Sequence, residues 1–157
     1  MNDNIVNGPE QDECVMAGLS HMAALLPLIG VVAPVVIWVT QKDKSKYVSF
    51  QALQAVAYQF VMIVAYFLSM MAYMVSFFGT FIFLPFSEST GSESANPLIF
   101  LPILVPFLIF AGIFFFGFLF VAYGVFGGIM AFLGKPFRYL LVANWIERYM
   151  SKQSRAA

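Results

Sequence analysis

Three long stretches without a single Asp, Glu, Lys or Arg residue constrain this chain more than any other feature. They cover residues 15–40, 47–86 and 98–134, which are 26, 40 and 37 residues long. A helix needs about 20 apolar residues to cross the hydrocarbon core of a bilayer, so each stretch is long enough to cross once. The pattern predicts an all-α, polytopic integral membrane protein.

The composition agrees with this prediction. Of the 157 residues, 61% are hydrophobic and 10% are charged, whereas about 25% are charged in a typical soluble domain. These values exclude a disordered chain and an ordinary soluble globule. The single cysteine, Cys14, cannot form a disulfide within the chain, and its role stays open. The N-terminal residues are acidic and lack the basic start of a secretory signal peptide.

We expect a membrane domain over residues 15–134, between an acidic N-terminal segment (1–14) and a basic tail (135–157). Pro27, Gly30 and Pro34 predict a break in the first crossing, because proline removes a helical hydrogen bond. The tail combines aromatic and basic residues near helical spacing, which predicts an amphipathic helix in the membrane interface. The three main transmembrane helices are expected over about 15–40, 49–84 and 97–134, and the last is either one helix or a broken one.

All basic residues lie either in the loop 41–46 or in the tail, whereas the second loop carries Glu88 and Glu93. Basic loops stay in the cytoplasm by the positive-inside rule. With three crossings, the N-terminus is therefore outside and the C-terminus is cytoplasmic. We expect the following basic residues to set this topology and to contact lipid headgroups: Lys42, Lys44, Lys46, Lys135, Arg138 and Arg148.

Small residues at helical spacing indicate where helices approach each other closely, since they allow backbones to come together in a membrane. One such stripe lies in the second apolar stretch and a Gly-x-x-x-Gly motif lies in the third. The predicted helix-packing residues are Ala65, Ser69, Ala72, Ser76, Gly124 and Gly128.

His21, the only histidine, lies inside the first apolar stretch and needs a polar partner, because an unpaired buried polar group is costly. Gln51, Gln54 and Tyr58 share one face of the second predicted helix by their spacing and are the main candidates. Gln59, Ser20 and Ser69 are further ones. The cluster either holds helices together or lines a polar cavity or proton path.

Reactive groups are scarce in this sequence. The apolar stretches contain no carboxylate, so neither a Ser-His-Asp arrangement nor a metal site of three or four ligands is expected. Nucleotide-binding motifs are absent. The basic residues flank the membrane segments, which is typical of topology signals and of contacts with lipid. We therefore expect no enzymatic activity, no catalytic residue, no metal, no cofactor and no nucleic-acid partner.

Two segments resemble a known family: residues 18–60, with the early histidine, the later prolines and the Lys-rich loop before Gln-Ala-Leu-Gln-Ala, and residues 134–142, Gly-Lys-Pro-Phe-Arg-Tyr-Leu-Leu-Val. They are similar to the small bacterial membrane domain that is related to the chloroplast Tic translocon. The resemblance implies a multi-helix domain in a bacterial inner membrane, with a cytoplasmic Lys-rich loop. It implies no catalytic residues.

The functional prediction is a non-enzymatic accessory or scaffolding subunit of a larger membrane complex. Its expected partners are the lipid bilayer and either other membrane protein subunits or further copies of the chain. The alternative is transport, as a Tic-like protein-translocation component or a small-solute channel. A solvent-reachable cavity near His21 would favour transport, and a closed, packed centre would favour the subunit.

Overall fold

The structure, a computed structural model, describes residues 8–26, 28–89, 100–135, 137–140 and 142–156, and this part of the chain contains helices and no strand. The chain divides into two units. Unit 1 comprises Met1–Ile63 and Phe120–Ala157, and unit 2 comprises Val64–Leu119. The elements are α1 (Gln11–Met22), the 3-10 helix η1 (Ala23–Leu25), α2 (Val32–Gln41), α3 (Lys46–Ser89), α4 (Leu101–Phe132) and α5 (Ala143–Ala156).

Two helices are long and apolar enough to cross a membrane. They are the Lys46–Pro85 part of α3, with 40 residues, and α4, with 32 residues. Both contain long stretches whose exposed side chains are apolar, which is unlike the polar outer face of an ordinary surface helix. The expected third crossing is not confirmed. The expected start of the last crossing, at residue 97, and the acidic residue Glu93 lie outside the described residues.

The first apolar stretch forms two short helices that are separated by a turn. α1 has 12 residues and α2 has 10. Between them Leu28 has a φ of 70°, and the Gly30 amide donates to the Leu26 carbonyl over 2.7 Å. A Cβ at position 30 would collide with the carbonyl oxygens of Ala23 and Leu26, so this turn requires glycine. Pro34 lies in the first turn of α2, where an amide has no helical partner in any case.

Contacts with α4 and with the residue pair beyond its end give the direction of α1. A Cβ built on Gly134 would lie 3.3 Å from Cys14 Sγ, and one built on Gly124 would lie 2.7 Å from Ala24 Cβ. α1 therefore runs antiparallel to α4.

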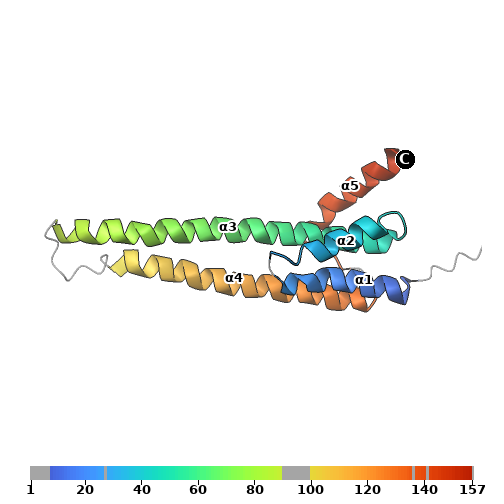
Figure 1. The fold of residues 1–157 in the computed structure, drawn as a ribbon, viewed down its shortest axis with the longest axis horizontal. Coiled ribbons are helices and arrows are strands. Elements are labelled where there is room, and N and C mark those ends of the chain that lie inside the picture. Colours follow the sequence, from blue (N-terminus) through green and yellow to red (C-terminus); the bar gives the residue numbers. More distant parts are fainter. Residues whose placement is uncertain (1–7, 27, 90–99, 136, 141, 157) are drawn as a thin grey trace, which may run out of the picture. The chain divides into compact units, whose positions relative to one another are not determined.

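The start of α3 runs antiparallel to α4 as well. Tyr47 Oη donates to the Ala131 carbonyl over 3.3 Å, and Tyr58 Oη donates to the Phe120 carbonyl over 2.7 Å. α1 and this part of α3 are thus parallel, so α2, which joins them, runs back along α1 (Figure 1).

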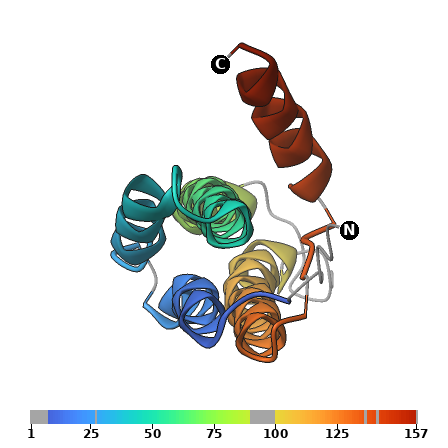
Figure 2. The ribbon, with the colours of Figure 1, turned by 90° about the vertical axis from the view of Figure 1, so that its right-hand side faces the viewer.

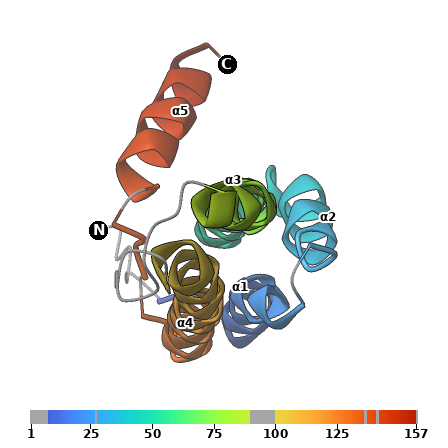
Figure 3. The same ribbon diagram turned by 90° about the vertical axis from the view of Figure 1, so that its left-hand side faces the viewer.

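Unit 1 is consequently a bundle of α1, α2, the start of α3 and the end of α4, from which α5 departs (Figures 2 and 3). The start of α1, the loop between α2 and α3, and the end of α4 lie together at one end of this bundle, which we call the charged end. It carries exposed charges from Glu10 and Asp12, from Lys42 to Lys46, and from Lys135. The predicted topology, with the N-terminus outside and the Lys-rich loop cytoplasmic, is not confirmed.

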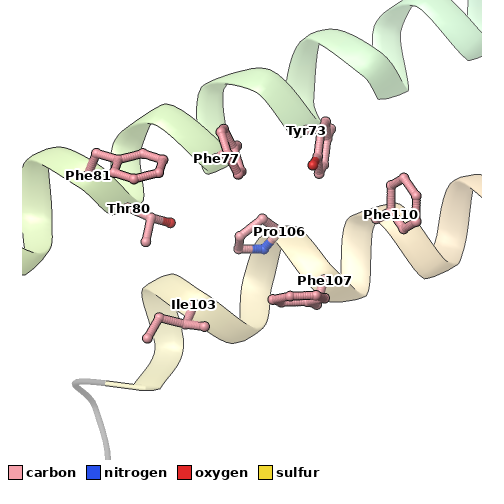
Figure 4. A pocket seen from close by; sticks show the side chains of 8 residues that line it. All are labelled: Tyr73, Phe77, Thr80, Phe81, Ile103, Pro106, Phe107 and Phe110. Carbon is pink, nitrogen blue, oxygen red and sulfur yellow. The ribbon is translucent and has the colours of Figure 1, made fainter.

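Unit 2 is a hairpin of α3 and α4, and a proline explains one of its contacts. Pro106 lies inside α4 and has no amide proton, so the carbonyl of Pro102 loses its helical partner. Thr80 Oγ1 of α3 donates to that carbonyl over 2.5 Å. An apolar groove of about 380 Å³ opens at this point between the two helices (Figure 4), lined by Tyr73, Phe77, Thr80, Phe81, Ile103, Pro106, Phe107 and Phe110.

Candidate functional site

The centre of unit 1 holds a buried polar cluster, which we call the His21 cluster. It consists of His21 from α1, Gln51, Gln54 and Tyr58 from α3, and Tyr139 from the segment between α4 and α5. His21, Gln51 and Gln54 are completely buried. Three separate parts of the sequence therefore meet at one point in the bundle.

Both ring nitrogens of His21 have partners. Nδ1 lies 3.0 Å from Tyr139 Oη, and Nε2 lies 3.0 Å from Gln51 Oε1. Burial raises the pKa of the Tyr139 hydroxyl above its usual range, and the neighbouring Tyr58 adds to this effect. The protonated hydroxyl donates to Nδ1, and Nε2–H donates to Gln51 Oε1. This assignment follows from the hydrogen-bond network and gives a neutral imidazole.

Gln54 binds the backbone of the segment that follows α4. Its Nε2 donates to the Phe137 carbonyl over 3.2 Å, and the Tyr139 amide donates to its Oε1 over 3.0 Å. The Gln54 side chain thus makes the two backbone hydrogen bonds that a neighbouring strand would make to an extended segment. Phe137 and Tyr139 are buried, whereas Arg138 and Leu140 between and after them are exposed, which is the alternation of an extended segment.

Aromatic rings close the cluster. The rings of Tyr58 and Tyr139 stack with centroids 4.1 Å apart and an interplanar angle of 5°. The His21 ring lies 5.3 Å from that of Tyr139 and 6.0 Å, edge-on, from that of Phe137. Gly127 of α4 makes room for Phe137, because a Cβ at this position would lie 2.7 Å from Phe137 Cε1.

Of the partners proposed for His21, the structure brings Gln51 into direct contact, while Gln54 and Tyr58 both contact Tyr139. Ser20 and Ser69 instead donate to carbonyls of their own helices. Sequence reasoning missed Phe137 and Tyr139, because residues 135–157 were read as one amphipathic helix. The structure begins α5 only at Ala143. Proline at position 136, which disfavours a helix at the preceding residue, was the available signal.

The two sets of predicted packing residues differ in their surroundings. Gly124 is buried against η1 and Gly128 against α1, where Cβ atoms at these positions would lie 2.7 Å from Ala24 Cβ and 3.1 Å from Met22 Cγ. The four small residues of α3 lie in unit 2, three of them half-buried and Ala72 exposed, in the stripe Ala65, Ser69, Ala72 and Ser76.

The predicted topology residues all lie on the surface of unit 1. Lys42, Lys44, Lys46, Lys135 and Arg148 are exposed, and Arg138 forms an ion pair with Glu147 of α5.

The His21 cluster can hold segments of the chain in place, and its geometry offers few groups that could take part in a reaction. Tyr139 and Gln51 satisfy both imidazole nitrogens, and the described residues contain no group of three or more His, Cys, Asp or Glu side chains able to hold a metal ion. Gln51 Nε2 is buried without a hydrogen-bond partner in the described part of the chain. The clearest physical effect of the cluster is to hold segment 137–139 between α1 and α3.

Comparisons with known proteins identify a different family from the one expected. A family model described as the magnetosome magnetite crystal formation protein family (MamF/MmsF) matches residues 12–146. No curated protein and no solved structure matches the chain. The expected relationship to the Tic translocon is therefore wrong: segments 18–60 and 134–142, which suggested it, lie within the MamF/MmsF match. Since this match covers most of the sequence, the chain belongs to the magnetosome magnetite crystal formation protein family.

Proposed function

We propose that the protein is a non-enzymatic membrane protein of the magnetosome that takes part in magnetite crystal formation as an accessory or scaffolding subunit. The family match over residues 12–146 carries this proposal. The two long apolar helices, Lys46–Pro85 and Leu101–Phe132, fit a membrane location.

The packing of unit 1 supports a subunit over a channel. A small-solute channel through the His21 region would need a water-filled path. His21, Gln51 and Gln54 are instead fully buried, and Tyr58 stacks on Tyr139 across the same region. Polar groups in membrane helices that are hydrogen-bonded to each other stabilise helix contacts.

We also propose a membrane topology with two crossings, by α3 and α4. α1 and α2 would reach only about 18 Å and 15 Å at 1.5 Å per residue, against a hydrocarbon core of about 30 Å. A hairpin of α3 and α4 enters and leaves the membrane on the same side. The charged end of unit 1, with the start of α1 and the Lys-rich loop, is then cytoplasmic by the positive-inside rule.

Deleting the gene in its magnetite-forming host tests the functional proposal. Electron microscopy of the mutant should reveal magnetite crystals that differ in size, shape or number from those of the parent strain. Expression of the full chain should restore them. Crystals of unchanged size, shape and number would overturn the proposal.

The subunit role is tested separately by extracting the tagged protein in a mild detergent. Reproducible migration in a much larger assembly is expected on a native gel. Migration solely as a monomer, together with a crystal defect in the deletion strain, would overturn the scaffolding role and leave the role in crystal formation standing.

A further inference from the structure

The start of α5 and the residue before it have a buried apolar side and an exposed side of different character. Val142, Ala143 and Ile146 are buried in unit 1, and the first and last of them join Phe137 and Tyr139 in its core. These contacts attach the start of α5 to the bundle. They cover only one side of the helix.

The other side of α5 combines an aromatic residue with two positive charges. Trp145, Arg148 and Lys152 follow one another at spacings of three and four residues, so they lie on one face. All three are exposed, Trp145 by 66% of its surface. Leu140, just before the helix, is 86% exposed.

The charge of this region is predominantly positive. Between residues 135 and 152 the sequence has four basic residues and one acidic residue, a net charge of +4 − 1 = +3. Arg138 pairs with the acidic residue, Glu147, on another face of α5. Arg148 and Lys152 therefore present their charges next to Trp145 without a neutralising carboxylate among the described residues.

An exposed tryptophan flanked by basic residues is typical of a helix lying in a membrane interface. The indole occupies the headgroup region, and long basic side chains reach anionic headgroups.

From this arrangement we infer that Leu140 and the Trp145–Arg148–Lys152 face of α5 bind the surface of a bilayer containing anionic phospholipids. The inference rests on the proposed membrane location. The partner is the lipid headgroup layer, with Trp145 below the phosphates and the two basic side chains among them. At about 1 kcal/mol for each basic residue near an anionic surface, the pair changes the equilibrium constant for binding of this face roughly 30-fold.

The fluorescence of Trp145 in the full chain tests this inference. The chain has two tryptophans, so Trp38→Phe leaves Trp145 as the reporter. The protein is reconstituted in vesicles of phosphatidylcholine, or of phosphatidylcholine with phosphatidylglycerol. We expect the anionic vesicles to shift Trp145 emission to the blue, to reduce its quenching by acrylamide, and to allow quenching by brominated acyl chains.

Matched variants separate the charge of this face from charge in general. Arg148→Gln with Lys152→Gln should abolish the difference between the two lipids. Lys42→Gln with Lys44→Gln removes the same amount of charge from the loop between α2 and α3 and should preserve the difference between the two lipids. The Trp145→Phe protein, which reports from Trp38, should respond equally in both lipids.

Three outcomes would overturn the inference: equal acrylamide quenching in both lipids, an unchanged difference in the Arg148/Lys152 variant, or protection that increases with protein density and not with phosphatidylglycerol. The last outcome would assign the face to a second copy of the chain. A protein that does not float with the vesicles at all would instead refute the proposed membrane location, whereas the crystal phenotype is measured independently in cells.

Discussion

Gly124 offers the sharpest test of how α1 and η1 pack on α4. A Cβ at this position would lie 2.7 Å from Ala24 Cβ, whereas carbon atoms in good contact are about 3.5–4.0 Å apart. Because Ala24 Cβ is fixed to the backbone, Gly124→Ala must push η1 away by roughly 1 Å. Such overpacking costs about 1–3 kcal/mol, and the gain in helix propensity offsets about 0.5–1 kcal/mol of it.

We therefore expect Gly124→Ala to lower the free energy of unfolding by about 1–2 kcal/mol. Gly117→Ala, in the same helix, is the matched control, since a Cβ there has no atom within 4 Å. It should be neutral or stabilise the protein by up to about 1 kcal/mol. Unfolding by SDS titration in mixed micelles, followed by circular dichroism, measures both. Equal shifts for the two variants would refute the packing of η1 against Gly124.

Three further substitutions test individual hydrogen bonds. Tyr139→Phe leaves His21 Nδ1 buried without its donor and should cost about 1–3 kcal/mol in the same unfolding assay; a cost close to zero would contradict the bond. Gln54→Leu removes both hydrogen bonds to segment 137–139 and should therefore speed tryptic cleavage after Arg138. Gln59→Leu is the control, since it deletes a buried amide nitrogen without a partner in the described residues, and it should leave the cleavage rate unchanged. Thr80→Val leaves the Pro102 carbonyl without its donor. It should destabilise the protein by about 1–2 kcal/mol more than Thr40→Val, because the Thr40 hydroxyl bonds carbonyls of its own helix. Equal effects of the two substitutions would argue against the contact between Thr80 and Pro102.

The long helices were predictable because their signal is local. Two apolar stretches without charge predicted helices over about 49–84 and 97–134, and α3 and α4 occupy most of these ranges. Hydropathy reports which residues avoid water and carries no information about the direction in which the chain continues after a break. Pro27, Gly30 and Pro34 therefore correctly predicted a helix break in the first apolar stretch. They did not predict that α2 returns along α1.

The His21 cluster was predictable only in part for a related reason. His21, Gln51 and Gln54 are polar residues in apolar stretches, so their need for partners is visible in the sequence. Tyr139 lies 118 residues from His21 and enters the cluster from an extended segment whose backbone is held by Gln54. A contact that depends on tertiary packing leaves no periodic pattern in the sequence.

The packing of α1 and α3 against α4, the His21 cluster and the two-crossing topology all depend on the reversal of the chain between α1 and α2. Labelling of single cysteines in sealed membrane vesicles by an impermeant maleimide tests it most directly. In a Cys14→Ser background, cysteines are introduced by Gly8→Cys, Lys44→Cys, Lys135→Cys and Ser92→Cys. We predict that the first three are labelled from one side of the membrane and Ser92→Cys from the other. Labelling of Gly8→Cys from the same side as Ser92→Cys would mean that the first apolar stretch crosses the bilayer, and would contradict the account.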